Sequence, residues 1–416
     1  MTVDVMRPPA PAERQARTAV AVLFFTNGAL FANLLPRFPQ IKADLGIGNA
    51  AYGLAVAAFP TGAIAAGLAA GVLIRRFGSG PVAVAGTMLT GIGVLAAGLS
   101  GSVVLFATAL FLAGAMDAIT DVAQNAHGLR VQRRYGRSII NSFHAIWSIG
   151  AVVGGSMAAG AIALGLSLGQ HLLISAVVFG IAACVALRFC LTGPDTEPVA
   201  EEAEKTYVAE KTDEADVEGR DRAERGERRR ARLRTRYVLA ALVLIAAGGA
   251  LVEDAGSSWA ALYLSDSLHA SGTLAASGYI ALVGAQFVGR LIGDRLVDRF
   301  GQRTVARFGG LIAAVGMGLA LAVPTATGTI LGFATAGFGV ATLVPAAMHE
   351  ADELPGLKPG SGLTIVSWLM RLGFLLSPPI VGLVADATSL RVGLLVVPLA
   401  GLMVMLLAGV LQARRR

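Results

Sequence analysis

The sequence predicts an all-α membrane protein, with twelve transmembrane helices in two pseudo-symmetric six-helix bundles. Composition is the first observation behind this prediction. Of 416 residues, 55% are hydrophobic and 15% are charged, and the mean hydropathy is +0.67. A soluble chain of this length is neither so apolar nor so poor in charge. Glycine, present 52 times, also suits helices that pack closely in lipid.

Recurring apolar runs are the second observation. Each is about 20 residues long, which is enough to cross a hydrocarbon core about 30 Å thick. Six runs precede a charged segment and six follow it. The expected helices occupy residues 18–38, 50–73, 81–100, 103–127, 138–163, 169–191, 237–264, 273–296, 304–323, 328–349, 361–385 and 390–411.

The charged segment separates the two groups of helices. It holds 13 of the chain's 27 acidic residues, together with 11 basic ones. With almost no apolar residues it cannot bury a core, so we expect a mobile linker, whose arginine-rich end either lies on anionic lipid or orients the next helix. The expected parts are an N-terminal tail (1–17), a first bundle (18–191), the linker (192–236), a second bundle (237–411) and a basic tail (412–416).

Basic residues in the short connections predict the orientation of the helices. Lysine and arginine gather in cytoplasmic loops of membrane proteins. Arg75 and Arg76 follow the second expected helix, and four arginines separate the fourth from the fifth. Both termini are therefore expected in the cytoplasm, in a multi-pass protein of the cell membrane. This placement accounts for the net charge of +7 without a nucleic-acid partner.

An internal repeat is the third observation. The sequence Arg76-Phe77-Gly78 recurs as Arg299-Phe300-Gly301, 223 positions later. The same displacement relates Gly114 to Gly337 and Gly150 to Gly373. A single ungapped displacement from the second to the fifth helix indicates two related halves. Halves related in this way are typical of transporters, whose binding site lies between them near the middle of the membrane.

Polar side chains form stripes on two neighbouring expected helices. Asp117, Asp121 and Asn125 are spaced four residues apart and therefore share one helix face. The next helix carries a similar stripe, made by Asn141, His144 and Ser148. An ionisable residue inside a membrane helix is costly and normally faces a water-filled path or a partner.

The two aspartates form the first candidate proton site. Asp117 lies 14 residues into its helix, roughly 21 Å along the axis and near the membrane centre. Asp121 is one turn deeper. Two carboxylates so close together in a low dielectric do not both ionise readily, so the pair can hold a proton reversibly. The alternative is a structural pair that is hydrogen-bonded to neighbouring helices.

Glu253 and Asp254 form the second candidate proton site. As neighbours on a helix they point about 100° apart, so one of them is expected to face the site, and Glu253 is our choice. They precede Gly256-Ser257-Ser258, where we expect the helix to break. The alternative role for the acids is capping or partnering at that break.

Further polar and aromatic residues are candidates for substrate binding. Arg371 is the one arginine that the sequence places firmly inside a membrane helix, where it either neutralises an acid or holds an anionic substrate. His144 can join a proton path or bind hydroxyl groups, and the two tryptophans can stack on a sugar ring or simply pack. The candidates are Asn27, Asn125, Asn141, His144, Trp147, Trp368 and Arg371.

The loop after the second helix resembles the signature of the major facilitator superfamily, Gly-x-Leu-x-Asp-Arg-x-Gly. The chain reads Gly71-Val72-Leu73-Ile74-Arg75-Arg76-Phe77-Gly78, with Arg75 in place of the aspartate, and its second copy runs from Asp294 to Gly301 and keeps Asp298. The resemblance implies that Arg75, Arg76, Asp298 and Arg299 belong to a cytoplasmic latch, and that the copy lacking aspartate latches weakly.

A finer resemblance is to the fucose-permease-like branch of bacterial inner-membrane members. It rests on Phe143-His144-Ala145 and on the stretch from Glu253 through Trp259 to Tyr263. The first helix lacks the acidic residue of fucose permease. Drug antiporters of the superfamily usually carry a Gly-Pro pair in the fifth helix, and here Gly150-Ala151-Val152-Val153-Gly154-Gly155 has no proline.

We therefore expect a secondary active transporter that uses alternating access and is proton-coupled, as a symporter of a small, sugar-like polar solute. The alternative within transport is a proton antiporter that exports an apolar compound. An enzyme is not expected, because the sequence has neither HExxH nor GxSxG. A receptor that binds ligand without flux is a further alternative. The expected partners are a small-molecule substrate, protons and membrane lipid, with no cofactor or metal, and the protein is expected to be a monomer.

Overall fold

The computed structural model describes residues 10–67, 69–136, 139–193, 221–354, 357 and 361–412, with side chains of the second bundle described from residue 233. The described residues form helices, turns and bends, with no strand among them. Residues 1–9 and 413–416 of the expected tails, and residues 194–220 of the expected linker, lie outside this part of the chain.

Among the described residues, the first half contains six helical stretches that are long and apolar enough to span a membrane. Some spans are single long helices, and others consist of short helical pieces joined end to end. Its elements are α1 (Pro11–Ala32), η1 (Leu35–Arg37), α2 (Phe38–Leu45), α3 (Asn49–Val56), α4 (Ala58–Ala66), α5 (Ala69–Phe77), α6 (Ser79–Gly98), α7 (Val103–Tyr135), α8 (Ile140–Ala163) and α9 (Leu168–Leu187).

The described part of the second half contains six more such stretches. Its elements are α11 (Asp221–Leu262), η2 (Tyr263–Ser267), α12 (Gly272–Phe300), α13 (Gln302–Ala322), α14 (Ala326–Val340), α15 (Leu343–Asp352), α16 (Ser361–Leu369), α17 (Arg371–Ala387), α18 (Leu390–Gly393), α19 (Val396–Leu407) and η3 (Ala408–Val410). Every expected membrane helix is thus present, and the fold prediction is confirmed.

Helix α11 differs from the expectation in two ways. It begins at Asp221, within the segment expected to be a mobile linker, rather than near residue 237. It also continues through Gly256-Ser257-Ser258, so the predicted break is wrong. Gly256 serves a close contact instead, because a Cβ atom there would lie 2.7 Å from the Leu282 side chain. Glycine here lets α12 approach α11 and does not end the helix.

The internal repeat is visible in the helix packing. A Cβ atom on Gly114 would lie 2.0 Å from the backbone oxygen of Phe59, and one on Gly337 would lie 2.1 Å from the backbone oxygen of Leu282. Both members of the second pair stand 223 positions after those of the first. Glycines at equivalent positions therefore meet partners at equivalent positions in the two halves, which confirms the repeat that the sequence predicts.

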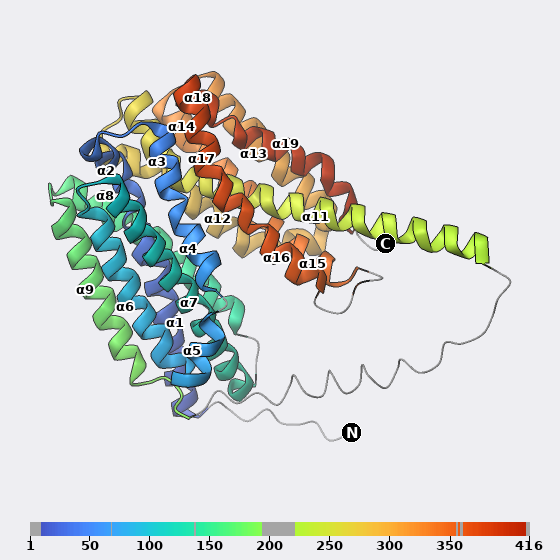
Figure 1. Ribbon diagram of the computed structural model, residues 1–416, viewed down its shortest axis with the longest axis horizontal. Coiled ribbons are helices and arrows are strands. Elements are labelled where there is room, and N and C mark those ends of the chain that lie inside the picture. Colours follow the sequence, from blue (N-terminus) through green and yellow to red (C-terminus); the bar gives the residue numbers. More distant parts are fainter. Residues whose placement is uncertain are drawn as a thin grey trace.

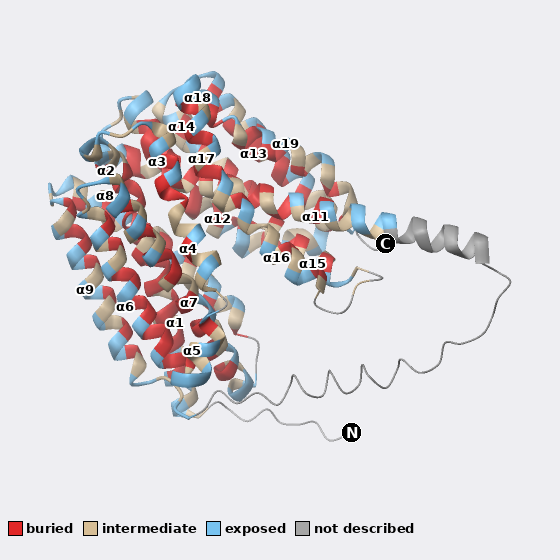
Figure 2. Cartoon of the chain, viewed as in Figure 1, coloured by how far each residue is buried: buried red, intermediate tan, exposed pale blue. Residues whose placement is uncertain are grey.

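The halves meet at one end and diverge toward the other. Figure 1 shows them side by side near α2, α3, α14 and α18, which we term the joined end, and further apart near α5 and α15. Buried residues concentrate inside each bundle (Figure 2). The opposite end, which we term the basic end, carries the loop arginines of both halves: Arg75, Arg76, Arg133, Arg134, Arg299 and Arg303.

Alanine in place of Gly114 or Gly337 should lower the thermal unfolding temperature of the purified protein. The added methyl group has no room beside the facing backbone, and overpacking of this kind typically costs about 1–3 kcal/mol. Gly160→Ala is the matched control, since a Cβ atom there meets nothing within 4 Å. Equal melting temperatures for all three variants would contradict the proposed role of the glycines in helix packing.

Candidate functional site

Asn27 is the centre of a hydrogen-bonded network in the first bundle. Its Nδ2 donates to Asp117 Oδ1 at 2.8 Å, and its Oδ1 accepts from Trp147 Nε1 at 2.8 Å. The residue is 6% exposed. One buried amide from α1 therefore holds an acid of α7 and an indole of α8, and it uses its donor and acceptor sides separately.

The close approach of α1 and α8 makes this network possible. A Cβ atom on Gly28 would lie 2.2 Å from the backbone oxygen of Trp147, and one on Gly150 would lie 2.3 Å from that of Phe25. Only glycine allows the two backbones to come so near. The Trp147 ring nitrogen then reaches the amide of Asn27, which stands next to Gly28 in α1.

Asp121 continues the network one turn along α7. Its Oδ1 accepts from Asn125 Nδ2 at 3.0 Å and from Gln124 Nε2 at 3.4 Å. Gln124 also reaches Asn27 Oδ1 at 3.4 Å. The stripe predicted from the sequence is therefore a continuous hydrogen-bonded chain, in which Asp117 is partly buried and Asp121 is exposed.

Basic residues of both bundles lie near Asp121. Arg371, the first residue of α17, and His144 of α8 both interact electrostatically with Asp121. His144 is exposed and stands edge-on to the ring of Phe24, with 5.2 Å between the ring centroids. Asp121 in the first bundle is thus within electrostatic range of a guanidinium from the second.

Glu253 is the centre of the matching group in the second bundle. Its Oε2 accepts from Gln286 Nε2 at 2.6 Å and lies 3.7 Å from Arg290 Nη2. Arg290 Nη1 also donates to Ser148 Oγ, in the first bundle, at 3.2 Å. One arginine of α12 therefore connects the acid of α11 with the polar stripe of α8.

Asp254 faces away from this group. Its Oδ1 accepts from Ser258 Oγ at 3.4 Å, one turn along the same helix. The two neighbouring acids point in different directions, as the helix geometry predicts. Glu253 rather than Asp254 faces the junction between the halves.

The prediction that Arg371 is the one intramembrane arginine is wrong. Arg290 lies within the span Gly272–Phe300 and contacts both halves. Arg290 lies inside the expected helix 273–296, four residues before the charged signature that begins at Asp294, so the sequence alone does not separate it from that signature.

The remaining predicted residues stand apart from these contacts. Asn141 is exposed in the first turn of α8, and Trp368, 57% exposed, lies near the end of α16. The guanidinium groups of Arg76 and Arg299 each lie over the ring of the following phenylalanine, at 5.3 and 5.4 Å. Asp298 and Arg75 are exposed at the basic end. Substrate and gating roles for these residues stay predictions.

Comparison with known proteins assigns the family. The chain matches the description "Major Facilitator Superfamily" over residues 20–356 and 256–416. The chain belongs to the Major Facilitator Superfamily. It is also 29% identical to an uncharacterised transporter, y4wD, of Sinorhizobium fredii (strain NBRC 101917 / NGR234), over 94% of this chain and 97% of that protein.

Solved structures of transporters share the fold of this superfamily member. The D-xylose-proton symporter superposes with a TM-score of 0.71 at 17% identity, covering 95% of this chain and 96% of that one. A bacterial homologue of the lysosomal transporter Spinster, in an inward-facing and occupied conformation, gives a TM-score of 0.71 at 13% identity, covering 96% of each chain. The protein is therefore a multi-pass membrane transporter of this superfamily.

Replacing Asn27 with alanine should destabilise the first bundle. Asp117 and the Trp147 ring would each lose a hydrogen-bonding partner, and an unsatisfied buried polar group costs about 1–3 kcal/mol. Thermal unfolding in detergent measures the effect. Asn141→Ala is the control, since Asn141 is exposed. A melting temperature for Asn27→Ala equal to that of Asn141→Ala would show that the network does not hold the helices together.

Proposed function

We propose that this transporter is proton-coupled and carries a small polar solute by alternating access. The observation that supports this most strongly is the chain of contacts from Trp147 through Asn27 to Asp117, continued by Asp121. It places two carboxyl groups of one helix, one turn apart, between hydrogen-bond donors and the other bundle. Such a pair can exchange a proton, and its change in charge alters its electrostatic interaction with the other bundle.

Charge on the acids is the proposed link between protonation and opening. Arg371 of the second bundle acts electrostatically on Asp121, and Glu253 lies beside Arg290, which also donates a hydrogen bond to Ser148. Adding a proton to either acid weakens the attraction between a carboxylate and a guanidinium. Because these groups connect the halves, such a change biases which arrangement of the bundles is favoured.

A polar, sugar-like solute fits the chemistry of the junction. Asn125, His144 and Trp147 offer hydrogen-bonding groups and a flat ring, the combination that binds hydroxylated rings. The fold is similar to that of a D-xylose-proton symporter, which supports both the proton coupling and the sugar-like solute of the proposal. Placement within the fucose-permease-like branch would agree with such a solute and stays a prediction.

We assign the observed arrangement to the inward-facing state. The halves are joined at the end away from the loop arginines, and those arginines predict the cytoplasmic side. The similarity to a Spinster homologue in an inward-facing conformation supports the assignment. The joined end then faces the outside of the cell, and the solute leaves toward the basic end.

Asp117→Asn should abolish accumulation of solute while leaving exchange intact. The amide keeps the shape of the side chain and its contact with Asn27 but cannot exchange a proton. Uptake driven by an imposed pH gradient, and counterflow at equal pH, are measured in proteoliposomes with a solute found by thermal-shift screening. Asp44→Asn, at an exposed site outside the network, is the control.

Continued accumulation by Asp117→Asn against a gradient would remove this residue from the coupling role. The direction of coupling has its own readout. If an inward proton gradient drives solute out of the vesicles, the protein is an antiporter. Ligand binding with no flux under any gradient would instead identify a receptor.

The latch at the basic end should be asymmetric. Asp298 occupies the aspartate position of the superfamily signature, whereas Arg75 replaces it in the first half. A charge beside a helix end contributes about 0.3–2 kcal/mol, which changes a two-state population several-fold. Asp298→Asn should therefore favour the inward-facing state, and Arg75→Ala should change little. Spin-label distances across the basic end measure this. Equal effects of the two substitutions would contradict the asymmetry.

A further inference from the structure

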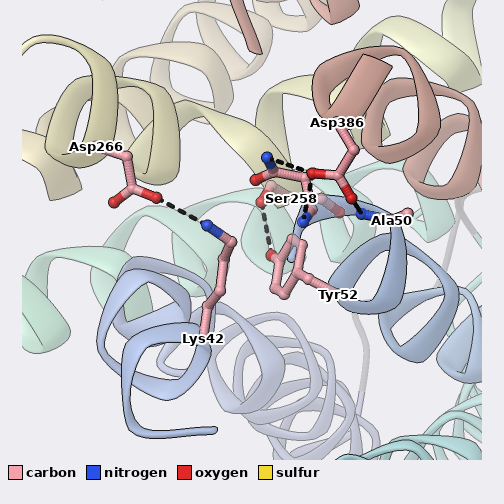
Figure 3. A network of polar contacts seen from close by, with 7 residues as sticks. Lys42, Ala50, Tyr52, Ser258, Asp266 and Asp386 are labelled. Carbon is pink, nitrogen blue, oxygen red and sulfur yellow. Dashed lines mark hydrogen bonds and ion pairs between the residues drawn. The ribbon is translucent and has the colours of Figure 1, made fainter. Parts of the chain in front are cut away.

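A carboxylate of the second bundle caps a helix of the first at the joined end. Asp386, in the last turn of α17, accepts hydrogen bonds from the first backbone amides of α3 (Figure 3). Asn49 N donates to Oδ1 at 3.0 Å, and Ala50 N donates to Oδ2 at 2.8 Å. The side-chain amide of Asn49 donates to Oδ1 at 2.9 Å. One carboxylate thus accepts three hydrogen bonds from the opposite half.

Helix α3 has no cap of its own at this position. Its N-cap residue is Gly48, which has no side chain that could accept a hydrogen bond. The glycine also leaves room for the carboxylate of Asp386, because a Cβ atom at position 48 would lie 3.1 Å from Asp386 Oδ2. The first amides of a helix lack intrahelical acceptors and favour negative charge. Asp386 supplies both the acceptor and the charge.

Two further contacts join the halves close to this cap. Lys42 Nζ lies 3.0 Å from Asp266 Oδ2, and Tyr52 OH donates to the backbone oxygen of Ser258 at 2.8 Å (Figure 3). The ring of Tyr52 is buried and meets Trp259 edge-on, with 4.9 Å between centroids. The cap therefore sits at the rim of an aromatic contact between the halves.

Glycines bring α3 and α17 into direct backbone contact beneath the cap. A Cβ atom on Gly53 would lie 2.2 Å from the backbone oxygen of Pro378, and one on Gly382 would lie 2.4 Å from that of Asn49. Asp386 and the amides that it caps lie on the same two helices as this contact, so moving α3 away from α17 here would also move the carboxylate away from the first amides of α3.

We propose that Asp386 is the latch of the joined end, and that capping α3 from the other bundle sets how readily this end opens. The inference rests on the alternating access proposed above. Asp386 and Asp266 are both exposed, so water screens both contacts. The Lys42–Asp266 pair contributes less because it is a single ion pair, whereas Asp386 accepts three hydrogen bonds. The amides of α3, in contrast, form charge-assisted hydrogen bonds and have no other acceptor on their own helix.

Distances between spin labels across the joined end test the latch. Labels at Leu164→Cys and Thr327→Cys lie at exposed sites of the two halves, in a chain whose Cys184 and Cys190 are serine. Asp386→Ala should raise the ratio of long to short distances by about fivefold, which corresponds to about 1 kcal/mol. Asp386→Asn keeps an acceptor without the charge and should give an intermediate shift, which keeps the test available if the alanine variant does not fold.

Two controls make the result specific. Asp44→Ala removes an exposed acid at the same end, and Asp266→Asn removes the ion pair with Lys42; each should shift the distances less than Asp386→Ala. The latch hypothesis would be contradicted if Asp386→Ala shifted the distances no more than Asp44→Ala does. It would also be contradicted if Asp266→Asn shifted them as much as Asp386→Ala does. Proton-driven uptake by the unsubstituted protein is measured separately. A result against the latch hypothesis can therefore be distinguished from a result against the proposed transport.

Discussion

The whole structure depends on one constraint, that polar groups inside a membrane must find their partners within the protein. The amide of Asn27 meets this constraint for three helices at once, since it binds Asp117 of α7 and Trp147 of α8. Arg290 does the same between the halves, through Glu253 and Ser148. The groups that stabilise the bundles are therefore the same groups to which we assign the response to a proton or a solute.

Close backbone contact is the second requirement, and glycine satisfies it in both halves. Gly114 and Gly337 meet equivalent partners 223 positions apart, so each bundle is built on the same set of close approaches. Gly53 and Gly382 extend this packing across the junction at the joined end. Bundles that are rigid inside and touch along a few glycine-lined contacts can rock as units, which alternating access requires.

The sequence predicted most of the fold and part of the site. Twelve apolar runs, the repeat and the stripe of Asp117, Asp121 and Asn125 are periodic features, and periodicity can be seen without coordinates. The contacts between the bundles could not be seen in this way. Arg290 pairs with residues 37 and 142 positions away, and Asp386 caps a helix that begins 337 positions earlier. The helix break that the sequence predicts at Gly256 is absent from α11, because sequence alone does not distinguish a glycine that ends a helix from one that lets a neighbouring helix approach.

Proton uptake on solute binding is the most direct measure of the central claim, that the acids between the bundles couple protons to transport. The purified protein is mixed with its solute in weakly buffered detergent solution containing a pH indicator, over a range of starting pH. The account predicts that binding takes up protons within a limited pH window, and that Asp117→Asn reduces the uptake. Solute binding with no change in bound protons at any pH would contradict it.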